Sequence, residues 1–548
     1  MILSALLVAV LSDGFNTFAS RPTAGEVAFY VPKILEAGST VHFQSEYFKL
    51  EGTVKRAVAS QGTLIVTGTT PTGGDFGLQR TPIGFEGFFR TPRHTVFVLQ
   101  GKDGLTLRAK KILDKGCGGS FESGISNGGG LQLGGPCDIF NTIDVFAPYT
   151  QEALQALVES GTVPPIAWYD AEALLRSLIR VDVLQANIAY INSEIPLQLN
   201  VRGLHLISEP EPSEDFLLPT MQEGLAGSGP FAELQDIRED LRADIVTLIS
   251  GNEFPFCGVA YLNSDVSQTL VGCLGGFVLA HEVGHNLNCC HALGDGGGCQ
   301  GYTDSGRGHR FFGEDDEQYR TIMAYSPGTR IDHFSNPDVL YEGAPTGIPG
   351  EADCAAMIWQ TREFLSNIRC RDGEEELSLL SFGSTLDECD VFTVEMAWQG
   401  AFDLHALQFN INDVNAVRSA GGEFADLSWD VYLLGTQLIA FVNDEPIPSS
   451  DLATTLTALE LRTRQGEKFL SDVYAIGANN DLMRVDHVSS ILTDSYCPGD
   501  LTDDNVINNA DLIAYLSTIP QPDLNCDGLN SFADLSFLLS RFGQTDCP

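Results

Sequence analysis

The sequence predicts a multidomain protein whose central domain is of the α/β (α+β) class, with a mixed sheet and one helix rich in histidine. Three observations lead to this prediction. The chain of 548 residues is long enough for three or four domains with their own cores. Near the middle, strand-like runs at 243–249 and 257–262 precede a helical histidine pattern. The C-terminal part contains two copies of one short loop–helix pattern.

The N-terminal part is predicted to be β-rich. Residues 1–20 have the features of a signal peptide, because small residues follow an apolar run, although no Lys or Arg precedes that run. Strand-like segments follow at 41–44, 63–67 and 94–99. We therefore assign residues 21–135 to a β-rich, propeptide-like region that ends in a linker rich in Gly and Ser.

Residues 281–291 read His-Glu-Val-Gly-His-Asn-Leu-Asn-Cys-Cys-His. On a helix, His281 and His285 lie one turn apart on the same face, where two imidazoles can bind one zinc ion. The chain must turn after the helix to bring His291 back as a third ligand. Glu282 then lies beside the metal, where a carboxylate can accept a proton from water. Three protein ligands leave one position open, which is typical of a catalytic zinc rather than a structural one.

A second element, Thr-Ile-Met-Ala-Tyr at 321–325, follows downstream. The two elements together resemble the metzincin clan of zinc peptidases, in which a methionine-containing turn lies beneath the metal. The whole stretch 138–371 is similar to the bacterial reprolysin-like metallopeptidases. The resemblance implies that Met323 is a scaffold residue and that an edge strand of the sheet binds substrate as an added strand. It also implies a last helix near 355–368.

Asn288 and Tyr325 leave alternatives open. Asn288 stands where the family has Gly, at a turn that needs a positive φ. Asn is the next most tolerant residue in that conformation, but the exchange is also what a non-catalytic relative would show. Tyr325 follows Met323 by two residues, and in some metzincins such a Tyr contacts zinc or the reaction intermediate; the alternative is a packed Tyr with a satisfied hydroxyl. His309 and His333 lie off the motif and are assigned structural roles.

The resemblance implies a secreted zinc-dependent endopeptidase that acts on protein or peptide substrates. Zinc would lower the pKa of water, and Glu282 would act as the general base before delivering the proton to the leaving amine. The alternative is a cell-surface or scaffold-associated binding protein in which the metallopeptidase fold is inactive.

The chain has 13 cysteines, a number that suits an oxidising compartment. We expect two local disulfides, Cys257–Cys273 and Cys354–Cys370. Cys117 has two interpretations. It pairs with Cys137 across the Gly/Ser linker, or its thiolate occupies the open zinc position as a latency switch, as in several metzincins.

Residues 376–495 are predicted to form a β-sandwich. Alternating strand-like segments separated by polar turns occur at 404–411, 429–434, 437–442 and 456–461. The block resembles cohesin-like modules, although no single motif in it is diagnostic. We expect it to be a spacer or accessory module.

Residues 497–548 contain two twelve-residue loops with oxygen side chains at positions 1, 3, 5 and 12, which is the calcium-loop pattern. The expected ligands are Asp500, Thr502, Asp504 and Asp511 in the first loop, and Asp523, Asn525, Asp527 and Asp534 in the second. An apolar helical run follows each loop, and the pair resembles a dockerin of the planctomycete type. The resemblance implies bound calcium and a cohesin-like partner; the alternative is an acidic tail without calcium.

The net charge excludes some classes of binding partner. With 73 Asp and Glu against 31 Lys and Arg, the net charge is −42, which argues against binding nucleic acid or an anionic membrane. After the N-terminal run, no segment approaches the ~18 apolar residues that a membrane span requires. We expect a secreted or extracellular protein, which the C-terminal module could attach to a cell surface.

Overall fold

The computed structural model describes most of the chain in two compact units. The described residues are 26–30, 35–44, 49–113, 141–159, 168–369, 378–492 and 499–544, with short gaps inside these ranges, among them 252–255 and 296–304. The first unit comprises Met1–Val31, Ala37–Arg56 and Ile65–Asp372, and the second comprises Pro32–Glu36, Ala57–Leu64 and Gly373–Pro548. The predicted signal peptide lies outside the described residues.

The N-terminal region forms a nine-stranded sheet in the order β8-β1-β2-β3-β4-β5-β6-β7-β9. Its strands are β1 (Glu26–Tyr30), β2 (Thr40–Gln44), β3 (Lys49–Ser60), β4 (Thr63–Thr69), β5 (Asp75–Thr81), β6 (Gly84–Arg90), β7 (Thr95–Gly101), β8 (Thr106–Arg108) and β9 (Lys110–Leu113). The three predicted strand segments coincide with β2, β4 and β7, so the β-rich prediction is confirmed for this region.

The central domain contains a mixed five-stranded sheet in the order β11-β10-β12-β14-β13. Its strands are β10 (Thr142–Tyr149), β11 (Gln198–Leu206), β12 (Ile245–Ser250), β13 (Gly258–Ala260) and β14 (Val266–Leu270). All neighbours are parallel except the edge strand β13, which runs antiparallel to β14. The two predicted strands are β12 and β13, and the sheet is mixed as expected.

Helices surround this sheet. They are α2 (Gln151–Glu159), α3 (Trp168–Asn192), α4 (Leu218–Leu225), α5 (Glu233–Leu241), α6 (Val278–Asn286) and α7 (Cys354–Leu365), with a short 3-10 turn η1 (Val271–Cys273) before α6. Short strands follow α6, namely β15 (Arg310–Phe312), β16 (Gln318–Arg320), β17 (Thr329–Arg330), β18 (Leu340–Tyr341) and β19 (Ala344–Pro345). The predicted last helix is α7.

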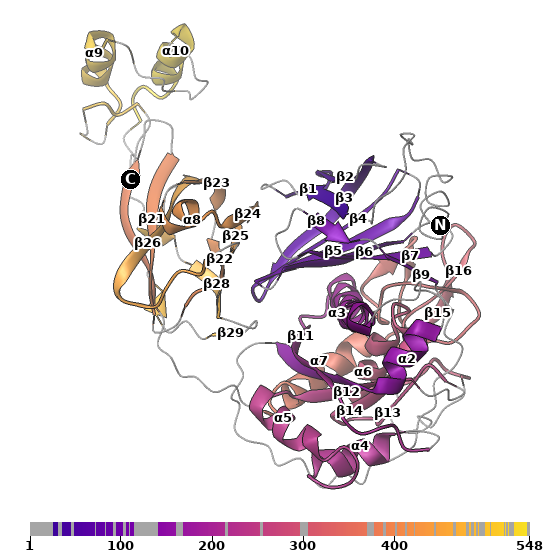
Figure 1. Ribbon diagram of the computed structural model, residues 1–548. Coiled ribbons are helices and arrows are strands. Elements are labelled where there is room, and N and C mark those ends of the chain that lie inside the picture. The colour runs from indigo at the N-terminus through magenta and orange to yellow at the C-terminus, as the bar shows by residue number, and fades with distance from the viewer. Residues whose placement is uncertain are drawn as a thin grey trace. The chain divides into compact units, whose positions relative to one another are not determined.

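Helix α3 lies between the N-terminal sheet and the central sheet (Figure 1). Every residue from 181 to 190 is buried, so this part of the helix has no solvent-facing side. Ile65 and Phe88 of the N-terminal sheet share one apolar core with Leu178 of α3 and Ile249 of β12. The two sheets of the first unit are therefore joined by a helix that both of them cover.

The second unit contains two five-stranded sheets, ordered β23-β26-β21-β20-β30 and β24-β25-β22-β28-β29. The first contains β20 (Ser378–Leu386), β21 (Val391–Gly400), β23 (Val414–Ala420), β26 (Ser450–Thr463) and β30 (His487–Val488); the second contains β22 (Ala406–Ile411), β24 (Asp430–Leu434), β25 (Gln437–Phe441), β28 (Leu470–Ile476) and β29 (Leu482–Met483). Strands β27 (Glu467–Lys468) and β31 (Ile491–Leu492) pair separately, and α8 (Gly422–Asp426) is a short helix. Trp398 of β21 and Phe409 of β22 belong to one core, as in a sandwich.

The C-terminal segment has two short helices, α9 (Asn509–Ser517) and α10 (Phe532–Ser540). Each begins with a capping box, formed by Asn508 with Asp511 and by Ser531 with Asp534. Among the described residues, no helix is both long and apolar enough to cross a membrane.

Candidate metal centre

Helix α6 carries the predicted motif through the core, and all nine of its residues are buried. It ends in a Schellman motif: the Asn288 N–H donates to the His285 carbonyl at 2.8 Å, and the Cys289 N–H donates to the Gly284 carbonyl at 2.8 Å. Asn288 has a φ of 66°, the left-handed conformation that the family's Gly would adopt. The exchange of Gly for Asn therefore preserves the turn that leads back to His291.

The structure brings together the three predicted histidines. Their Nε2 atoms lie 3.1 Å apart for His281 and His291, 3.2 Å for His281 and His285, and 3.1 Å for His285 and His291. A zinc ion bound at about 2.0–2.1 Å to each nitrogen requires a spacing close to this, so the three nitrogens fit one ion.

The other ring nitrogens orient the imidazoles for this role. Nδ1 of His281 lies 2.9 Å from the Ile322 carbonyl, and Nδ1 of His285 lies 2.7 Å from the Cys289 carbonyl. Both carbonyls accept from an Nδ1–H tautomer, which leaves the Nε2 lone pairs directed at the shared centre. Burial first, and then the neighbouring His285 and His291, hold the pKa of His281 well below its usual value, which keeps the ring neutral.

Glu282 is almost completely buried, with 1% of its surface exposed. A feature that the sequence did not reveal makes room for it. A Cβ atom on Gly258, the first residue of β13, would lie 2.7 Å from both Cγ and Cδ of Glu282. Gly258 thus allows the edge strand to pass directly beside the predicted general base, and no motif marks this residue in the sequence.

Met323 is fully buried beneath α6. A Cβ atom on Gly284 would lie 2.6 Å from its sulfur, so the helix rests on the methionine at this glycine. Tyr325 approaches the histidines, because its hydroxyl lies 2.8 Å from Nε2 of His291. Tyr325 thus lies beside the histidine triad, in a contact that is compatible with both alternatives, a role at the metal and a packed Tyr with a satisfied hydroxyl.

A partly buried ion pair holds Tyr325 in place. Asp295 accepts from Arg310 Nη1 at 2.6 Å and from the Tyr325 N–H at 2.9 Å. Arg310 Nη1 also donates to the Tyr325 carbonyl at 3.1 Å. The loop after His291 and the turn after Met323 are thereby tied together, a contact between distant segments that the sequence could not predict.

The two histidines that were assigned structural roles, His309 and His333, make packing contacts of their own. His309 stacks on Phe311 with ring centroids 5.6 Å apart, and burial lowers its pKa. His333 lies 3.3 Å from Asp332 and packs edge-on against Tyr341. Both have the packed environments expected of structural residues.

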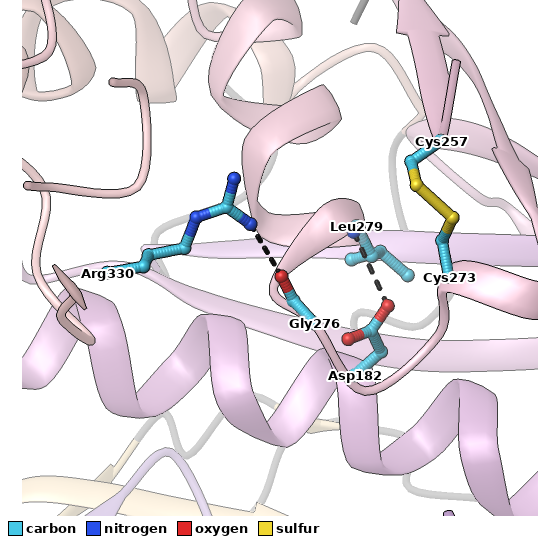
Figure 2. The surroundings of a disulfide bond; sticks show 6 residues. All are labelled: Asp182, Cys257, Cys273, Gly276, Leu279 and Arg330. Atoms are coloured by element: carbon cyan, nitrogen blue, oxygen red, sulfur yellow. Dashed lines mark hydrogen bonds between the residues drawn. A yellow bond between two sulfur atoms is a disulfide. The ribbon is translucent and has the colours of Figure 1, made fainter. Parts of the chain in front are cut away.

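One predicted disulfide is present and one prediction was wrong. Cys257 and Cys273 are joined, linking the start of β13 to the 3-10 turn before α6 (Figure 2). Cys354 is a buried free cysteine, so its expected pairing with Cys370 is incorrect. As the first residue of α7 it packs into the domain core with Ile358 and Leu365. Cys117, Cys137 and Cys370 lie outside the described residues.

In the first C-terminal loop, carboxylate oxygens of Asp500, Asp504 and Asp511 lie within 4.8 Å of one another. The Thr502 hydroxyl donates to Asp511 at 3.0 Å. In the second loop, Asp534 is buried at the start of α10, whereas the other predicted ligands lie outside the described residues, namely Asp523, Asn525 and Asp527.

The central domain is similar to known peptidases. Residues 141–335 match the family model Reprolysin_5, described as metallo-peptidase family M12. The chain is 27% identical over 204 residues to a peptidyl-Asp metalloendopeptidase of Stenotrophomonas maltophilia (strain R551-3), and 24% identical over 204 residues to one of Xanthomonas campestris pv. campestris. Each alignment covers 36% of this chain, with 48% and 47% of the two relatives, so the chain spans about half the length of the curated relatives it matches.

Among solved structures, the non-cellulosomal cohesin of Archaeoglobus fulgidus aligns with 22% of this chain and 92% of its own, at 10% identity and a TM-score of 0.17. A score at this level supports no conclusion about the second unit. The family match and the histidine triad together support a metallopeptidase, and zinc is the metal that M12 metallopeptidases use.

Proposed function

We propose that this chain is a zinc-dependent endopeptidase of the reprolysin-like metzincin type. The observation that carries the proposal is the convergence of three histidine Nε2 atoms, 3.1–3.2 Å apart. The buried Glu282 lies on α6, the helix that carries His281 and His285. Three imidazoles as metal donors beside one carboxylate are the arrangement typical of a hydrolytic zinc site rather than a structural one.

His281, His285 and His291 would hold the ion, which supplies Lewis-acid activation of water and of the scissile carbonyl. Glu282 takes a proton from the attacking water and passes it to the leaving amine. The Tyr325 hydroxyl, within 2.8 Å of His291 Nε2, donates a hydrogen bond to the oxyanion that develops at the carbonyl.

The decisive experiment compares the full chain with Glu282→Gln, which keeps the size of the side chain but cannot accept the proton. Zinc content is measured in both before hydrolysis of casein is followed. We expect one zinc per triad in both proteins and a loss of at least about 100-fold in turnover for the variant. A folded, zinc-loaded wild type that cleaves no protein would instead favour the alternative, a surface or scaffold-associated binding protein.

For the substrate class, we propose cleavage next to aspartate. The support comes from the two relatives, whose names describe peptidyl-Asp metalloendopeptidases. Mass spectrometry of a digested peptide library tests this directly, because enrichment of Asp on one side of the cleaved bonds is expected. Cleavage sites without such enrichment would show that this chain has a different specificity.

We further propose that the C-terminal segment is a calcium-binding, dockerin-like module with a cohesin-like partner, in a secreted protein. The three clustered carboxylates of the first loop support the calcium site, and the repeated capping boxes support the duplication of the loop–helix unit. The disulfide Cys257–Cys273 supports an oxidising compartment. The site is tested by calorimetric titration with calcium of the full chain and of its variants Asp504→Asn and Asp511→Asn. If both variants gave the same heat of binding as the wild type, the calcium site would be refuted.

A further inference from the structure

The segment that leads into α6 has an unusual backbone. We call residues 274–277, between η1 and α6, the entry loop. Gly275 has a φ of 89° and Phe277 a φ of 63°. A bulky residue in the left-handed region costs on the order of 1 kcal/mol and persists only where the surroundings fix it. Phe277, which is the N-cap residue of α6, also provides no side-chain cap for the helix.

Two residues of α3 fix the entry loop. Asp182 accepts from the Gly275 N–H at 3.2 Å through Oδ1 and from the Leu279 N–H at 3.4 Å through Oδ2. Gln185, one turn further along α3, donates from Nε2 to the Gly275 carbonyl at 3.1 Å. Figure 2 shows Asp182 reaching from α3 to the first turn of α6. The cap that the helix lacks locally is therefore supplied by another helix.

A third contact comes from the small sheet formed by β15, β16 and β17. Nη1 of Arg330, in β17, donates to the Gly276 carbonyl at 2.7 Å (Figure 2). The disulfide at Cys273 immediately precedes the entry loop. The loop is thus held from α3, from β17 and from the strand β13 that passes the general base.

Burying a carboxylate at this position costs desolvation free energy. Asp182 is completely buried, and burial raises its pKa to about 7 even though backbone N–H groups and Arg330 oppose the shift. A short polar residue within the loop would cap a helix without burying an acid. What a carboxylate on α3 adds is a fixed relation between α3 and the first turn of α6, two residues before His281.

We propose that Asp182, supported by Gln185 and Arg330, is a positioning residue of the metal centre: it fixes the entry loop and thereby the direction in which His281 and Glu282 face. Its effect on turnover depends on the proposed peptidase activity. Its effect on metal affinity does not, because zinc binding is measured without a substrate.

The test is Asp182→Asn in the full chain. The amide keeps one acceptor for Gly275 but presents N–H groups towards Leu279, so one bond of the cap is lost. We expect the zinc dissociation constant, measured by competition with a chromophoric chelator, to rise about 10- to 100-fold. We also expect kcat to fall at least about 10-fold while KM changes less than about two-fold. Amide hydrogen exchange in residues 275–281 should become faster.

Asp144→Asn is the matched control, because Asp144 is equally buried on β10 and holds Asn200 and Arg202 on β11. It should lower stability without changing zinc affinity. The proposal would be overturned if a folded Asp182→Asn protein kept the zinc affinity, the amide exchange rates and the kcat of the wild type. It would also be overturned if Asp182→Asn and Asp144→Asn lost the same amount of zinc affinity. If Asp182→Asn does not fold, Arg330→Met decides by the same readouts. A wild type without peptidase activity would refute the proposed function, while the zinc and exchange measurements would still decide the role of Asp182.

Discussion

Replacing Gly258 with Ala tests the geometry of the general base with a single methyl group. Gly258 lies in β13 with a backbone conformation open to any residue, so Ala adds no strain of its own. The new Cβ would lie 2.7 Å from Glu282 Cδ and closer still to Oε1, against an ordinary contact of at least 3.4 Å, so the carboxylate must move by at least about 0.7 Å. A misplacement of about 1 Å can lower kcat about 100-fold, and we expect a loss of that order here. The three atoms nearest to that Cβ all belong to Glu282 and none to a histidine, so we expect zinc affinity to stay the same.

The assay measures kcat on casein-derived peptides together with zinc affinity by chelator competition. Gly272→Ala is the control, because a Cβ at Gly272 meets no atom within 4 Å and this residue lies in the neighbouring 3-10 turn. We expect this control to retain wild-type kcat. A Gly258→Ala enzyme with kcat close to wild type would refute the contact with Glu282. Loss of zinc from that variant would show that the strand supports the metal site rather than the base.

The remaining predictions concern single side chains. Tyr325→Phe should lower kcat about 100-fold with little change in KM, because it removes the hydroxyl beside His291; steady-state kinetics measure this, and an unchanged kcat would assign Tyr325 to packing alone. Asn288→Ala should lower the free energy of unfolding by about 1 kcal/mol, since Ala tolerates the left-handed φ less well than Asn, whereas Asn288→Gly should leave it nearly unchanged; urea titrations of the two metal-free variants would contradict the reasoning if both behaved alike. Burial raises the pKa of Glu86 from 4.5 to about 7 despite its ion pair with Arg180, so the folded state holds this proton more tightly and loses about 3 kcal/mol as pH rises from 4.5 through 7. Glu86→Gln should flatten that decline, which urea unfolding at pH 5 and pH 8 would reveal; equal pH slopes in the two proteins would show that Glu86 is not its source.

The sequence alone determined the features that depend on local spacing. Histidines four residues apart share a helix face whatever surrounds them, and the residue after such a helix needs a left-handed φ, which Asn288 adopts. Alternating apolar residues likewise identified some of the strands in both β-rich regions, three in the N-terminal sheet and four in the second unit, because a half-buried strand requires that period. Neighbouring cysteines identified one disulfide but failed for Cys354, whose burial in the core no spacing reveals.

Only the tertiary structure decided how distant segments meet. Gly258 makes room for Glu282, Asp182 caps α6 from another helix, and the pair Asp295–Arg310 holds Tyr325. None of these contacts has a sequence signature, because each depends on chain segments separated by 15 to 97 residues being packed to within a few ångströms. Local sequence patterns specify which helices and strands form and which face of each carries the apolar or functional side chains. The close packing of those helices and strands determines which side chains contact and orient one another. This packing is set by the whole core rather than by any one segment.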